Sequence, residues 1–248
     1  MKIDHPTAEM LPQLRQLWQN TFGDSDAFLD IFFSTAYSPM RSMCLWEEGQ
    51  LAAAAYWLDC QVGQQKVAYI YAVATAAPFR MRGFCRTLMK NIHTILAHQG
   101  YSSSLLVPSD SGLRQMYRTM GYADFGGIRE FTCHAAAPAI PLRQIHKEEF
   151  SALRRQYLPE NAVLQEGHTL ELLDQVALFY AGTDFLLTVS REESQILEFL
   201  GNTERIPGIL LSLGMTSAHI RTPGTEAFAM CRTWSHENMP TYLGFALD

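Results

Sequence analysis

Three arginines and a glycine lie close together in the stretch Arg80-Met81-Arg82-Gly83-Phe84-Cys85-Arg86. An apolar run of strand length, residues 66–75, precedes this stretch, and apolar residues at helical spacing follow it. Successive backbone N–H groups at a helix N-terminus converge on one place, where the helix dipole favours negative charge. Gly83 allows a ligand to approach the backbone closely, and the arginines can add charge-assisted hydrogen bonds. The stretch therefore predicts an anion site, and we expect a phosphate or a pyrophosphate.

Other kinds of phosphate and metal site find no support in the sequence. The loop is neither a GxxxxGK motif followed by Ser or Thr nor a GxGxxG motif. The cysteines are odd in number, widely spaced and without a CxxC pair, so we expect reduced thiols, no disulfide framework and no metal. A net charge of −6 without a basic stripe makes nucleic acid an improbable partner, because phosphate neutralisation dominates that binding.

Length and composition are those of a folded protein. The 248 residues place the chain between one large domain and two small ones. Apolar residues make up 48% of the chain and charged residues 18%, which argues against disorder. The start lacks the features of a signal peptide, and no window approaches the roughly 18 apolar residues of a membrane span. We expect a cytoplasmic protein with no membrane partner.

The elements around the loop can be predicted from apolar spacing. We expect a helix over about residues 10–20, then strands over 51–58 and 66–75, of which the second is buried on both faces. A helix after the arginines, a strand over 103–107 and a short helix over about 111–120 should follow. An aromatic face at residues 28–33 could be core or pocket wall. Helices and strands in this order indicate a mixed α/β protein.

The second part of the chain echoes the first. The segment AAAPAIP (135–141) has the composition of a linker. After it, EEFSALR echoes EMLPQLR, and the strand-like SQILEFL leads into RIPGIL much as YIYAVAT leads into RMRGFC. We infer a weak internal duplication with domains at 1–134 and 139–248. Pro207 removes an amide donor from the second loop and Leu210 replaces its small residue, so we expect the copy to keep the turn and lose the anion site.

The stretch YIYAVATAAPFRMRGFCRTLM, followed by LRQMYRTMGY, resembles the acetyl-CoA motif of the GNAT superfamily of N-acetyltransferases. The resemblance covers residues 1 to about 134. It departs from the family pattern at Cys85, where Gly or Ala is usual, and at Pro78, which falls one residue late. It implies a GNAT acyl-CoA N-acyltransferase fold, an α/β structure with a mixed sheet, and a smaller, degenerate GNAT-like C-terminal domain.

The resemblance also implies the ligand and the residues that hold it. Acetyl-CoA would be the cosubstrate, and no metal is needed. The backbone of Val73 and Thr75 would pair with the pantetheine arm, and the loop would hold the pyrophosphate. The loop residues are Arg80, Met81, Arg82, Gly83, Phe84, Cys85 and Arg86. Cys85 is either a small residue in a tight place or a thiol activated by the helix N-terminus.

The implied chemistry is direct attack of an amine of a small molecule or peptide on the thioester. Tyr117 matches the family's tyrosine, which protonates the CoA sulfur, although a core tyrosine is the alternative. No Asp or Glu lies in residues 66–75. The base is therefore a water chain or, as in tandem proteins of the enhanced-intracellular-survival type, the C-terminal carboxylate, here at Asp248.

Two other classes of protein remain open. Without a carboxylate on the central strand, the chain could be a non-catalytic acyl-CoA-binding sensor or regulatory module. It could also be a purely structural α/β protein in which the arginine loop is a solvated turn. The sequence identifies neither the amine acceptor nor the oligomeric state.

Overall fold

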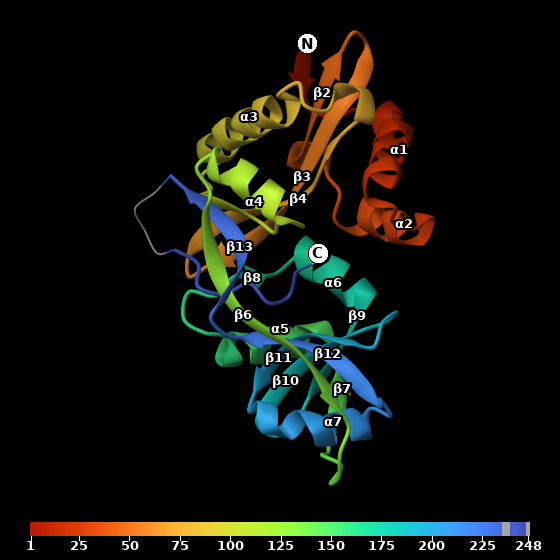
Figure 1. Cartoon of the computed structure of the whole chain (residues 1–248), viewed down its shortest axis with the longest axis vertical. Coiled ribbons are helices and arrows are strands. Elements are labelled where there is room, and N and C mark those ends of the chain that lie inside the picture. The colour runs from red at the N-terminus through yellow and green to blue at the C-terminus, as the bar shows by residue number, and fades with distance from the viewer. Residues whose placement is uncertain (235–238, 247–248) are drawn as a thin grey trace.

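The computed structural model describes residues 1–234 and 239–246. Two parts are stacked along the long axis, with the N-terminal half of the chain above and the C-terminal half below (Figure 1). All strands of the described residues belong to one continuous mixed sheet, so the predicted mixed α/β class is confirmed. Among the described residues, no helix combines the length and the apolar character needed to cross a bilayer.

The upper part contains the elements predicted around the arginine loop. The strands at 51–58 and 66–75 and the helices on either side are confirmed, with somewhat longer bounds, whereas three further strands were not predicted. The elements are β1 (Lys2–Asp4), α1 (Leu11–Phe22), α2 (Asp26–Thr35), β2 (Ser42–Glu47), β3 (Gln50–Val62), β4 (Gln65–Thr75), α3 (Phe84–His98), β5 (Ser103–Leu106), α4 (Ser111–Arg118) and β6 (Ala123–His134).

The lower part repeats much of this order. Of its strands, only the one at SQILEFL was predicted, and it is confirmed as β11. The elements are β7 (Arg143–Ile145), α5 (Lys147–Tyr157), β8 (Leu164–Gln165), α6 (His168–Val176), β9 (Ala177–Ala181), β10 (Phe185–Ser190), β11 (Gln195–Gly201), α7 (Ile206–Ser212), β12 (Ser217–Pro223) and β13 (Glu226–Thr233).

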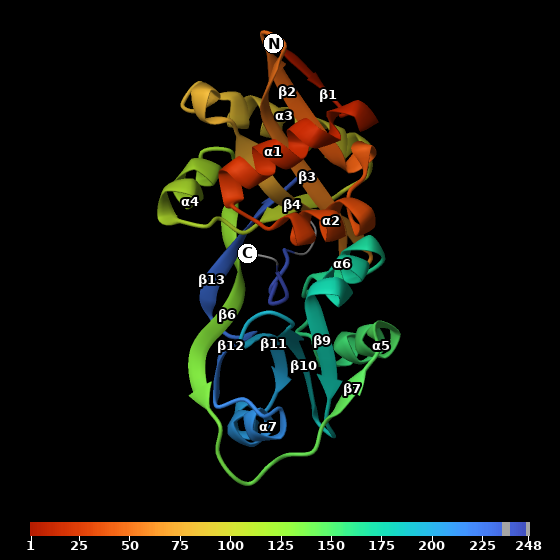
Figure 2. The ribbon, with the colours of Figure 1, turned by 90° about the vertical axis from the view of Figure 1, so that its right-hand side faces the viewer.

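The central strands of the upper part are buried on both faces. Along β4, Val67 and Tyr69 belong to one core cluster, whereas Ala68 and Ile70 belong to another. This alternation follows the period of two in a strand. The first cluster packs under α1 and α2 around Trp18, and α3 covers the second. The two core layers thus hold β4 rigidly between helices (Figure 2).

The last strand of the chain lies inside the upper sheet. Along the sheet, the strand order is β1-β2-β3-β4-β5-β13-β6-β12-β11-β10-β9-β7. β13 therefore separates β5 from β6, and β6 continues downward to pair with β12 (Figures 1 and 2). The division at 1–134 and 139–248 stays a prediction, and it did not foresee this exchange of strands.

The last described residues connect a core cluster of the upper part with one of the lower part. Leu243 and Ala246 are buried in the cluster under α1 and α2, whereas Tyr242 and Phe245 are buried in a cluster of the lower part. The side chain of Gln165 donates a hydrogen bond to the backbone carbonyl of Phe245. The C-terminal end of the described chain thus lies between the two parts, near the middle of the molecule (Figure 2).

Arg232 fastens β13 to the upper part. Its Nη1 donates to the carbonyl of Met120 at 2.6 Å and lies 3.1 Å from Nδ1 of His93. Nε2 of His93 lies 2.8 Å from the hydroxyl of Tyr122. Burial, together with the nearby Arg232 charge, lowers the pKa of His93 from 6.5 to about 4. A neutral imidazole is therefore part of the attachment of β13.

This buried histidine predicts a dependence of stability on pH. Between pH 6.5 and about pH 4, the unfolded chain binds a proton at His93 that the folded chain does not, so the free energy of unfolding falls on acidification. Chemical denaturation at several pH values in this range gives the free energy of unfolding as a function of pH. This free energy should change less steeply with pH for His93→Asn than for the wild type, whatever the absolute stability of the variant. Equal slopes would contradict the assignment.

Candidate functional site

β4 and β5 diverge after a short parallel pairing. Their register runs from Val67 opposite Ser103 to Tyr69 opposite Leu105. Beyond that pair, β4 carries a bulge, where the register to β3 shifts and Ala72 has a φ of 49°. β5 ends one residue after Leu105 and turns toward α4. The two strands therefore open like a V, and the open end faces their carboxyl termini.

A cleft of about 830 Å³ occupies the open end of the V. One wall is β4 and its bulge, and the other consists of β13 and β6, with α4 and the α1–α2 turn at the sides. The residues that line the cleft include Trp18, Asp24, Phe28, Tyr71, Val73, Arg114, Tyr117, Ile128, Glu130, Glu226 and Phe228. In the aromatic face at 28–33, both alternatives apply to different residues. Phe32 is buried in the core, whereas Phe28 lines the cleft.

Val73 and Thr75 lie on the β4 side of the opening. The N–H of Ala76 donates to the carbonyl of Ala52 in β3 at 2.9 Å. Backbone groups alternate in direction along a strand, so those of Thr75 and Val73 are turned away from β3. The carbonyl of Thr75 accepts a hydrogen bond from Nε of Arg80 at 3.0 Å. The orientation suits the predicted pairing with a ligand, and the pairing itself stays a prediction.

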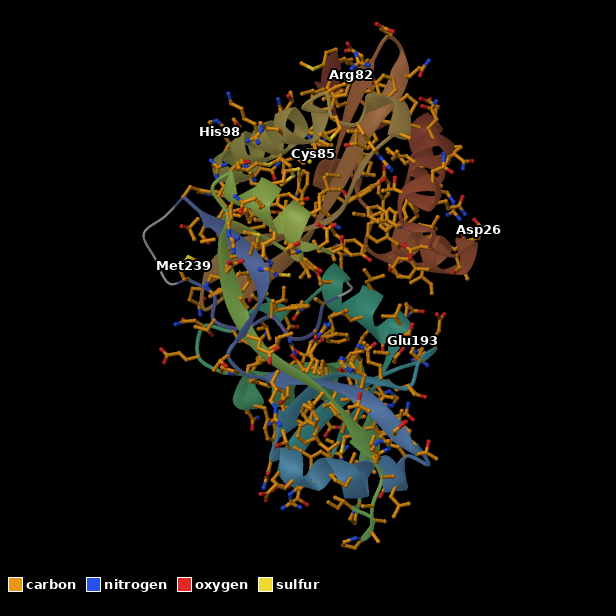
Figure 3. The ribbon with its side chains drawn as sticks, in the orientation of Figure 1. Asp26, Arg82, Cys85, His98, Glu193 and Met239 are labelled. Carbon is orange, nitrogen blue, oxygen red and sulfur yellow. The ribbon has the colours of Figure 1, made fainter. Side chains whose placement is uncertain are left out.

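The loop before α3 presents backbone rather than side chains. Met81 and Gly83 have φ angles of 60° and 80°, both in the left-handed region. Gly83 is the N-cap of α3, and no side chain caps this end of the helix. The first N–H groups of a helix lack intrahelical partners and form an anion site when they are left open. Figure 3 shows Arg82 and Cys85 at this end of α3.

The three arginines differ in what they contact. Arg80 is bonded to Thr75, and Arg86 donates to the carbonyl and hydroxyl oxygens of Thr119 at 3.2 and 2.7 Å. Arg82 lies over the rings of Phe79 and Phe84, at 5.5 and 5.1 Å from their centroids. Arg86 therefore ties α3 to the end of α4 in this structure. The anion-binding role predicted for all three stays a prediction.

Tyr117 and Cys85 meet beside the cleft. Tyr117 lines it and is 6% exposed. Burial raises the pKa of its phenol well above 10, and the nearby Cys85 and Tyr122 add to this, so the hydroxyl keeps its proton at neutral pH. Burial also raises the pKa of the Cys85 thiol to about 11. This direction favours the alternative in which Cys85 is a small residue in a tight place, and its role stays a prediction.

Three carboxylates that sequence reasoning missed line the cleft: Asp24, Glu130 and Glu226. Asp24 accepts a hydrogen bond from Nε1 of Trp18 at 2.6 Å, and Glu130 accepts one from Nε of Arg221 at 2.8 Å. None lies on β4, and no sequence motif marks them. Asp248 lies outside the described residues. Within the described chain, no cluster of three or more His, Cys, Asp or Glu side chains could hold a metal ion.

The loop of the lower part has a different backbone. Gly208 lies inside α7, which begins at Ile206 with Pro207 in its first turn. Its φ is not positive, in contrast to that of Gly83. A Cβ on Gly208 would lie 2.4 Å from the carbonyl oxygen of Pro138, so close packing explains this glycine. The expectation that the second loop keeps the turn of the first is therefore wrong.

Comparison with known proteins gives one family and a recurrent fold. Residues 2–124 match the model of the acetyltransferase (GNAT) domain. The search of curated proteins returned no match. A GCN5-related N-acetyltransferase from Kribbella flavida is 17% identical, with a TM-score of 0.71 over 94% of this chain and 70% of that one. One from Anabaena variabilis is 14% identical, with a TM-score of 0.74 over 94% and 72%. Eis1 from Mycobacterium abscessus is 11% identical, with a TM-score of 0.69 over 94% and 74%.

The backbone of the loop predicts how substitutions affect a phosphate-bearing ligand. In Gly83→Val, the left-handed φ that places the first N–H groups of α3 becomes strained, so we expect the Kd for coenzyme A to rise at least about tenfold. Arg82→Ala should raise it less, because the backbone is kept. Isothermal titration calorimetry measures both.

Gly100→Val provides the matched control. Gly100 follows the other end of α3, has a φ of 79° and, like Gly83, has open space around a Cβ. The same strain, roughly 1–2 kcal/mol, is then introduced away from the loop. We expect this variant to lose stability but to bind coenzyme A normally. Normal binding by Gly83→Val would overturn the anion site.

Proposed function

Because residues 2–124 belong to the acetyltransferase (GNAT) domain family, we propose that this chain transfers an acetyl group from acetyl-CoA to a primary amine. The acceptor is a small molecule or a peptide. The observation that carries the proposal is the cleft at the divergence of β4 and β5, with an open helix N-terminus beyond the end of β4 and the protonated Tyr117 at its side.

The cosubstrate is held mainly by backbone. The N–H groups at the start of α3 bind the pyrophosphate, and Met81 and Gly83 turn the loop so that these groups converge. The pantetheine arm lies along the free side of β4 and pairs with Val73 as an added strand would. The thioester then reaches the part of the cleft beside Tyr117.

Transfer proceeds by direct attack of the neutral amine on the thioester carbonyl carbon. The C–N bond forms, the C–S bond breaks, the amine gives up a proton, and the CoA sulfur takes one from the hydroxyl of Tyr117. A phenol whose pKa is raised by burial stays protonated until the thiolate departs. The base is a water chain or the C-terminal carboxylate, since β4 has no Asp or Glu.

The lower part is best explained as a degenerate copy of the upper one. β11 is parallel to β12 as β4 is to β5, and α7 follows β11 as α3 follows β4. α5 occupies the place of α1 in this order. The copy has exchanged its last strand with the original, since β13 pairs with β5 and β6 pairs with β12. Its function is then structural, and it supplies one wall of the cleft.

A non-catalytic acyl-CoA sensor is the second candidate. The observation that favours it is the absence of an acidic residue from β4. Incubation with acetyl-CoA and a panel of amines separates the two candidates through release of the CoA thiol. Thiol release that depends on an amine supports the enzyme, whereas tight binding of acetyl-CoA without release on any amine supports the sensor.

The proposal predicts the effect of removing one hydroxyl. Tyr117→Phe keeps the ring in place and removes the proton donor, so kcat should fall by about 100-fold while the affinity for acetyl-CoA is unchanged. Tyr122→Phe is the matched control, because Tyr122 is buried nearby but bonds to Ser104 and His93 outside the cleft. It should lose stability and keep kcat. Unchanged turnover by Tyr117→Phe would dismiss Tyr117 as the acid.

A further inference from the structure

The wall of the cleft opposite β4 is built from two strands of distant origin. Glu226 of β13 is paired with Ile128 of β6. Paired residues, and residues two positions apart on one strand, share a face of the sheet. Glu226, Phe228, Ile128 and Glu130 therefore lie on one face, and all four line the cleft. The C-terminal part of the chain thus contributes an acidic residue and an aromatic residue to the site.

The charged side chains on this side of the cleft differ in whether they have a partner. The carboxylate of Glu130 is paired with Arg221, whose side chain is buried. The guanidinium of Arg114, which also lines the cleft, is bonded to Asp124 and to the carbonyl of Phe228. Glu226 is exposed, and its carboxylate has no ion pair or hydrogen bond with any described residue. It is the carboxylate on this wall that is open to a ligand.

Glu226 lies beyond the end of β5 along the cleft wall. Met230 of β13 is paired with Leu106, the last residue of β5. Glu226 is four residues further along, about 13 Å beyond the end of β5 at the usual rise of a strand. A carboxylate binds a cationic group through charge-assisted hydrogen bonds. At this place on the cleft lining, the exposed carboxylate of Glu226 suits a second positive charge on the same acceptor.

We propose that the acceptor carries a second cationic group and that Glu226 binds this group. The inference rests on the proposed function and adds a specificity-determining residue to it. The acceptor is an elongated diamine or polyamine-like molecule whose apolar stretch lies against Phe228 and the aromatic side of the cleft. Selection of the acceptor thus depends on a strand from the C-terminal part of the chain.

The test compares two amines of equal length on the full chain. Diaminooctane and octylamine share the reacting amine and the apolar stretch, and differ in the second charge. The wild type should acetylate diaminooctane with a kcat/KM about tenfold higher, which is the scale of one charge-assisted contact. Glu226→Gln should abolish this preference by raising the KM for diaminooctane, with no change for octylamine or in the Kd for coenzyme A.

Glu193→Gln is the matched control. It removes the same charge from an exposed residue of the lower part that does not line the cleft (Figure 3), and should keep the preference. The inference is overturned if the wild type shows no preference for diaminooctane. It is also overturned if Glu226→Gln keeps the preference or loses activity equally on both amines. In each case the proposed function stands. Failure of the wild type to acetylate any amine in a panel would overturn both.

Discussion

The parallel pairing of β4 and β5 ends at Tyr69 and Leu105, and the candidate site depends on that interruption. If the two strands stayed paired, their backbone groups would satisfy one another and leave no opening. The bulge at Ala72 turns β4 away, while β13 takes the other edge of β5. The sheet therefore stays continuous around a cleft, and the backbone of β4 is left facing it.

The exchange of last strands joins the two parts through the site itself. β13 closes the edge of β5 that would otherwise be open, and open edges are prone to pair with other chains. Arg114 and Arg232 bond β13 to the upper part through the carbonyls of Phe228 and Met120, and Arg232 also to His93. The C-terminal part therefore helps to form the cleft even though its own loop before α7 lacks the left-handed turn.

Much of the site could be predicted because it is local in sequence. The strand at 66–75, the loop with Gly83 and the helix that carries Tyr117 follow one another within about fifty residues, and their types and spacing predict an anion site. The contributions of Asp24, Glu130 and Glu226 could not be predicted, because they depend on strand exchange and on a turn between helices. The environment of Cys85 could not be predicted either. The pKa of Cys85 is set by the solvent that the fold removes, which the motif does not reveal.

The proposed function requires that a phosphate-bearing acyl donor binds with its pyrophosphate at the start of α3 and its arm along β4. Hydrogen–deuterium exchange of the full chain with and without coenzyme A tests it most directly, because the claim concerns backbone N–H groups. We expect coenzyme A to slow the exchange of backbone N–H groups in residues 73–87, with no slowing of comparable size around β11 and α7. Protection confined to the lower part, or no protection at residues 81–86 when coenzyme A is bound, would contradict it.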